Sequence, residues 1–153
     1  MIVCLLACFA FPVPADGVLA NGRWTGLGTT LVLPPGGRWT VDPDTFGSGL
    51  PGVLLEGRVG TVDIAVAGYT PGPWTAAQLA EGTALDALLT LAPARTDGPI
   101  SRLTGCRGAV IQHLDGMDRL ARRGDTPGSV LVIYAWGAPS DDRRAALTRV
   151  GCT

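Results

Sequence analysis

One eight-residue stretch constrains the fold more than any other. Ser129 to Trp136 reads SVLVIYAW, with no glycine, proline or charged residue. Successive side chains of a strand point to opposite faces of its sheet. A strand that is apolar at consecutive positions is therefore buried on both faces. The sequence therefore predicts a central strand here.

Turn residues divide much of the remaining chain into further short strands. The 22 glycines and 12 prolines favour turns over a helical bundle. Val62, Ile64 and Val66 alternate with other residues, as in a strand with one buried face. We expect strands at 29–34 and 38–41, paired as a hairpin across the turn at 34–37, and further strands at 53–60, 62–69, 100–103 and 108–114. Residues 117–123 fit either a strand or a helix.

Two segments have the sequence features of helices. Thr75 and Gln78 form a capping-box pattern ahead of a helix expected over residues 76–90. Ser140 is the expected N-cap of a second helix, which runs to about residue 150 and begins with two aspartates at its positive end.

The order of these elements predicts the fold class. A hairpin, two strands, a helix, a meander and a closing helix suggest an α+β domain, in which an antiparallel sheet is flanked by two helices as an α/β/α sandwich. We expect one such domain over residues 29–153, preceded by a flexible entry segment at residues 16–28.

The first fifteen residues predict an export signal. The unbroken apolar run from Ile2 to Phe11 has the length of a signal-peptide core and is too short to span a bilayer. Cleavage is expected after Ala15, with Ala20 as the fallback site, although no Lys or Arg precedes the run. Two alternatives stay open: lipidation at Cys8, which ends a lipobox-like LLAC sequence, and burial of the run as a strand of a cytosolic protein. Export predicts a secreted or periplasmic protein, or a membrane-anchored bacterial lipoprotein.

The cysteines follow from this interpretation. Cys4 and Cys8 belong to the leader, so Cys106 and Cys152 are the pair that a mature exported domain retains. An even number of cysteines in such a domain favours a disulfide. The alternative is two buried free thiols.

Charge excludes one class of partner. The formal net charge is −1, and all 12 basic residues are arginines spread along the chain. Without a basic excess to neutralise phosphates, nucleic acid is not an expected partner. A membrane is expected as a partner only through a lipid anchor, and the expected partner is another exported or envelope protein.

Few residues suggest chemistry. His113 is the only histidine and could act as a general base, but no GxSxG motif supplies a nucleophile. Asp115, Asp118 and Asp125 lie near it in sequence, yet their spacing matches no EF-hand or zinc-protease pattern. We therefore expect no catalytic, metal or cofactor site.

One surface is a candidate for binding. Trp24 and Trp39 could form an exposed aromatic patch, because Trp74 and Trp136 have expected roles at a helix start and at the end of a core strand.

Three segments together resemble the PsbP-like family, whose fold is also that of Mog and of small bacterial lipoproteins of the DcrB type. They are Leu33-Pro34-Pro35-Gly36 with Trp39, Val62 to Val66, and the strand Val130 to Tyr134 followed by a helix from Asp141 to Val150. The chain departs from the pattern by the insertion of Gly37 and Arg38 before the tryptophan. The resemblance implies an exported, cofactor-free accessory or interaction protein.

The function expected from all of this is a non-catalytic accessory or protein-interaction role outside the cytoplasm. The alternative is a small secreted hydrolase or metal-dependent enzyme that uses His113.

Overall fold

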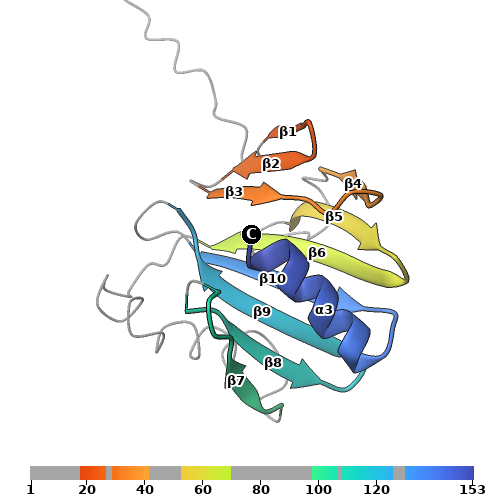
Figure 1. Cartoon of the computed structure of the whole chain (residues 1–153), viewed down its shortest axis with the longest axis vertical. Helices are drawn as coiled ribbons and strands as arrows, with labels where there is room; N and C mark the ends of the chain where they lie inside the picture. Colours follow the sequence, from red (N-terminus) through yellow and green to blue (C-terminus); the bar gives the residue numbers. More distant parts are fainter. Residues whose placement is uncertain (1–17, 27–28, 42–52, 70–97, 107, 126–129) are drawn as a thin grey trace, which may run out of the picture.

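The computed structural model describes residues 18–26, 29–41, 53–69, 98–106, 108–125 and 130–153. In this part of the chain, strands form two antiparallel sheets and one helix packs beside them (Figure 1). The smaller sheet has the order β1-β2-β3, with β1 at Val18–Ala20, β2 at Arg23–Gly26 and β3 at Thr29–Val32. The larger sheet has the order β4-β5-β6-β10-β9-β8-β7.

The strands of the larger sheet are β4 at Arg38–Thr40, β5 at Val53–Val59, β6 at Val62–Tyr69, β7 at Ile100–Arg102, β8 at Val110–Leu114, β9 at Met117–Arg123 and β10 at Val130–Trp136. Helix α3 spans Ser140–Gly151.

Strand β10 lies in the middle of the larger sheet, as its sequence predicts. It pairs with β6 on one side and β9 on the other, both antiparallel. Leu131 and Ile133 are fully buried, and so is Val132, which points to the other face. Both faces of the sheet are therefore buried around β10.

Short turns set the register of the hairpins. Val59 pairs with Val62, so only Gly60 and Thr61 connect β5 to β6. Gly60 has a φ of 61°, a left-handed conformation that glycine adopts without steric cost. Leu114 likewise pairs with Met117 across the turn between β8 and β9.

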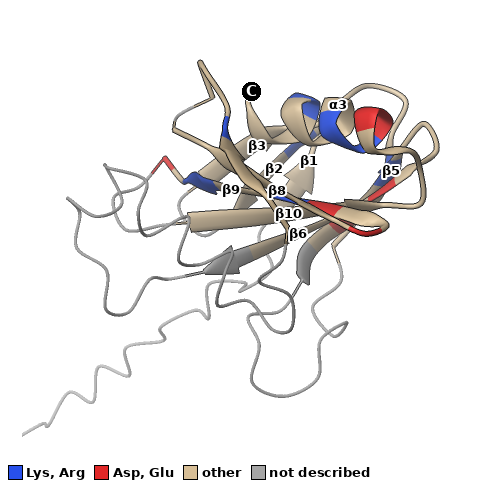
Figure 2. Ribbon diagram, turned by 90° about the horizontal axis from the view of Figure 1, so that it is seen from below, with Lys and Arg blue, Asp and Glu red and all other residues tan. Residues whose placement is uncertain are grey.

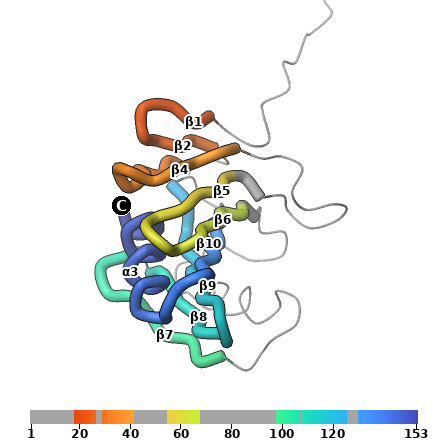
Figure 3. The backbone as a smooth tube through the Cα atoms, turned by 90° about the vertical axis from the view of Figure 1, so that its right-hand side faces the viewer, coloured from red at the N-terminus to blue at the C-terminus, as the bar shows by residue number. Residues whose placement is uncertain are grey.

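The core lies between one face of the larger sheet and a layer made of α3 and the smaller sheet. Ile133, Leu120 and Ile111 share one cross-strand row on that face, which we call the α3 face. A Cβ atom added at Gly151 of α3 would lie 2.9 Å from Cδ2 of Leu120, so the end of the helix rests directly on this row. Figures 2 and 3 show α3 on one side of β6 and β10.

The smaller sheet contributes to the same core. Trp24 and Leu31 lie directly opposite each other on β2 and β3, and both are fully buried. They belong to one cluster with Leu147 and Val150 of α3, so this side of the helix faces the core. The Thr153 hydroxyl lies 3.3 Å from the carbonyl of Val32, so the end of the chain lies against β3.

The expected α+β sandwich with two flanking helices is wrong. The described residues are mainly strands in two antiparallel sheets, and α3 is the one helix among them. Residues 117–123, which fit either state by sequence, form β9 inside the sheet. The helix expected at 76–90 lies outside the described residues.

The smaller sheet also changes the expected pairing. The hairpin of 29–34 with 38–41 does not form, because β3 pairs with β2 while β4 pairs with β5. Part of the segment expected as a flexible entry, residues 18–26, supplies β1 and β2. The pairing of β2 with β3 places Trp24 opposite Leu31 and removes both large apolar side chains from water, which favours it.

The start of α3 differs from expectation by one residue. Pro139 is the N-cap, and no side chain caps the helix. Ser140 is therefore the first helical residue, with its hydroxyl 3.5 Å from Oδ2 of Asp118.

Candidate functional site

The expected aromatic patch is wrong. Trp24 is fully buried in the core, and Trp39 is half-buried against it. A Cβ atom at Gly57 would lie 2.3 Å from Cε3 of Trp39, so the indole packs directly over the glycine opposite it in β5. These two tryptophans stabilise the fold, and they offer no exposed binding surface.

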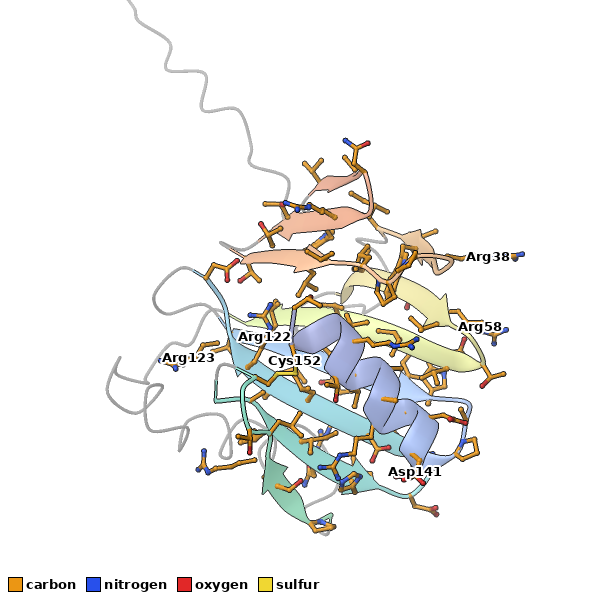
Figure 4. The ribbon with its side chains drawn as sticks, in the orientation of Figure 1. Arg38, Arg58, Arg122, Arg123, Asp141 and Cys152 are labelled. Carbon is orange, nitrogen blue, oxygen red and sulfur yellow. A yellow bond between two sulfur atoms is a disulfide. The ribbon has the colours of Figure 1, made fainter. Side chains whose placement is uncertain are left out.

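The expected disulfide is confirmed. Cys106 and Cys152 are bonded, with their Cα atoms 4.8 Å apart and a sequence separation of 46. Cys106 is almost completely buried, and Cys152 directly follows α3. The bond ties the end of the helix to the turn before β8 (Figure 4). Cys8, the possible lipidation site, lies outside the described residues.

His113 forms a close pair with a buried carboxylate. It lies on β8 directly opposite Asp118 of β9. Its Nδ1 is 2.6 Å from Oδ1 of Asp118, whose side chain is fully buried, while 27% of the His113 side chain is exposed. A carboxylate in this position fixes the orientation of an imidazole ring and which nitrogen carries the proton.

The second oxygen of Asp118 binds α3. Nε of Arg143 donates to Oδ2 of Asp118 at 2.6 Å, and another nitrogen of Arg143 donates to the carbonyl of Ala138, also at 2.6 Å. The Arg143 side chain is 10% exposed. One buried carboxylate thus links β8, β9 and the first turn of α3.

The other aspartates near His113 in sequence do not join it. Asp115 is exposed in the turn between β8 and β9. Asp125 accepts a hydrogen bond from the backbone of Thr30 at 2.9 Å, far from the histidine along β9. Among the residues that the structure describes, no three His, Cys, Asp or Glu side chains gather as metal ligands would.

A second feature lies on the sheet face opposite the α3 face. Arg38, Arg58, Asp63 and Trp136 are directly paired across β4, β5, β6 and β10, and we call them the arginine–tryptophan row. The side chains of Arg38 and Arg58 extend outward at the same edge of the molecule (Figure 4). Trp136 is 37% exposed.

Arg58 and Asp63 form a two-point ion pair in this row. The guanidinium contacts the carboxylate at 2.7 and 3.1 Å. These hydrogen bonds lower the pKa of Asp63 from its ordinary value, and they raise the pKa of Arg58. Arg38 has no such partner in the described part of the chain, although it lies directly opposite another arginine.

Sequence reasoning missed three of these residues for different reasons. The sequence shows Asp118 only as one of three aspartates near His113, because residues 117–123 fit either a strand or a helix. The sequence around Arg143 predicts a helix, but it does not indicate the contact of Arg143 with Asp118. Trp136 is expected only to end a core strand, and as the last residue of β10 it is partly exposed.

The comparisons with known proteins add no family. No helix in the described residues is long and apolar enough to cross a membrane. No protein-family model matches the chain, and no curated protein matches it.

Proposed function

We propose that this chain is an exported, non-catalytic interaction domain. Support for export comes from the buried Cys106–Cys152 disulfide, since such bonds persist in oxidising compartments, and from the apolar run expected to act as a leader. The intact mass of the protein from its host tests this part, because it reports cleavage after Ala15, lipid on Cys8 and the disulfide together.

The arginine–tryptophan row is the observation that carries the interaction role. Like charges placed directly opposite each other destabilise a sheet, yet Arg38 faces Arg58, and among the residues that the structure describes only the latter has a carboxylate partner. Departures from local rules of this kind concentrate at functional sites. Arginine and tryptophan are also the residues that most often dominate the energy of protein interfaces.

A photo-crosslinking residue tests this role. Placed at Trp136 in cells of the host, it should give a discrete adduct that is absent when the same residue replaces exposed Thr148 on α3. Arg38→Ala with Arg58→Ala should weaken that adduct. Identical adducts at both positions, or none at Trp136, would contradict the proposal.

The His113–Asp118 pair supports a second candidate, a small secreted hydrolase. A histidine with Nδ1 held by a buried carboxylate and with part of its ring exposed has the arrangement of a general base. His113→Gln keeps a donor toward Asp118 but has no basic nitrogen. If the domain is a hydrolase, this variant should lose hydrolysis of p-nitrophenyl acetate and keep its fold; an unchanged rate would contradict this candidate.

A further inference from the structure

Ser101 has a hydroxyl with an unusual environment. It lies in the middle of β7 directly opposite Ile111 of β8. Its Oγ is buried and has no hydrogen-bond partner in the described part of the chain. Buried hydroxyls nearly always have partners, and an exception calls for a specific cause such as a catalytic role.

His113 is the neighbour that gives this hydroxyl a role. It lies two residues beyond Ile111 on the same strand, so both side chains point to the α3 face. Ser101 and His113 are therefore diagonal neighbours on adjacent antiparallel strands, about 7–8 Å apart. Rotation of the serine and imidazole side chains can span this distance, and catalytic hydrogen bonds are often long or unformed in the absence of substrate.

The orientation of the imidazole ring agrees with this placement. Nδ1 is directed toward Asp118 on β9. The two nitrogens of an imidazole lie on opposite sides of the ring axis, so Nε2 is directed away from β9, toward the side of the sheet where β7 lies. In the described residues Nε2 has no hydrogen-bond partner, and it is the nitrogen available to accept a proton.

We propose that Ser101, His113 and Asp118 are the nucleophile, the general base and the positioning carboxylate of an esterase site on the α3 face of β7, β8 and β9. The proposal rests on the hydrolase candidate above and names its nucleophile and substrate class, a carboxylic ester. It uses none of the arginine–tryptophan row, so it is compatible with an interaction role for that row, and it replaces only the non-catalytic part of the function proposed first.

The reaction follows the usual two steps of acyl transfer. Oγ of Ser101 forms a bond to the ester carbonyl carbon as its proton passes to Nε2 of His113. The bond from that carbon to the alkoxide then breaks, and the alkoxide takes the proton and leaves as an alcohol. Water attacks the acyl-serine, gives its proton to Nε2, and the bond to Oγ breaks. The released serine oxygen recovers the proton, and the acid departs.

The contacts of Asp118 separate the roles of two serines. Arg143 and Ser140 both approach Oδ2, while His113 takes Oδ1. The Ser140 hydroxyl thus lies next to the Asp118 carboxylate and away from Nε2 of His113. It is not placed to give its proton to that nitrogen. It is a matched control, because its hydroxyl is also close to Asp118.

A fluorophosphonate probe tests the proposal on the full oxidised protein. Such a probe reacts only with an activated serine, forming an oxygen–phosphorus bond while fluoride leaves. We expect modification of the peptide that carries Ser101, loss of it in Ser101→Ala, at least a tenfold slower rate in His113→Gln, and no change in Ser140→Ala. Near-UV circular dichroism confirms that each variant is folded.

The possible outcomes distinguish the assignment of Ser101 from the hydrolase candidate itself. Modification at another serine, with the same dependence on His113, would overturn the assignment of Ser101 and leave the hydrolase candidate standing. No modification of any serine in the folded protein would overturn both. Modification at Ser101 that is unchanged in His113→Gln would overturn the proposed base.

Discussion

Removal of the Cys106–Cys152 bond gives the clearest quantitative expectation. A variant with Cys106→Ala and Cys152→Ser keeps a small apolar residue at the buried position and a polar one at the half-buried position. The bond joins residues separated by 46 positions. Loop-closure entropy for a loop of that length predicts that its loss lowers the free energy of unfolding by about 4 kcal/mol.

Urea unfolding, followed by the fluorescence of buried Trp24, measures this change. For a chain of this size, about 4 kcal/mol corresponds to a fall in Tm of about 12–16 °C. The wild-type protein treated with a reductant should match the variant, because both lack only the cross-link. A loss below about 1 kcal/mol, with an unchanged slope against urea, would refute the loop-closure reasoning.

Three further changes test the packing and the charges. Asp118→Ala leaves Arg143 as a buried unpaired charge and should cost about 3–5 kcal/mol in urea unfolding, whereas adding Arg143→Met should recover part of that loss. Arg58→Ala should destabilise the protein at pH 7 and have little effect at pH 2. Its guanidinium lowers the pKa of Asp63 in the folded state, so the stabilisation is present above the unfolded pKa near 4 and is lost as the pH falls through the folded value. Leu147→Ala should cost about 2–5 kcal/mol by thermal or urea unfolding, because the side chain is fully buried.

The positions of strands could be predicted from the sequence, but their assignment to sheets could not. Alternation and turn residues placed β5, β6, β8 and β10 close to their observed bounds. The pairing of β3 with β2 depends on two buried side chains, Trp24 and Leu31, that meet only in the folded chain. The local sequence pattern carries no information on such non-local contacts, although these contacts determine the fold class.

The candidate sites, too, could be predicted only in part from the sequence. The disulfide could be predicted, because Cys106 and Cys152 are the two cysteines that remain once Cys4 and Cys8 are assigned to the expected leader. The position of Asp118 beside His113 could not, because it depends on the register that the two-residue turn after Leu114 imposes. A shift of one residue would turn Asp118 to the other face and abolish the pair.

Helix α3 explains why the covalent and ionic contacts lie where they do. A helix of 12 residues is marginal on its own in water, so its stability must come from contacts with the sheet. Arg143 binds Asp118 at the first turn, Leu147 fills the core at the middle, and the disulfide holds the residue after the last turn. Because these contacts are spread along the helix, loss of one leaves the others to hold it on the sheet.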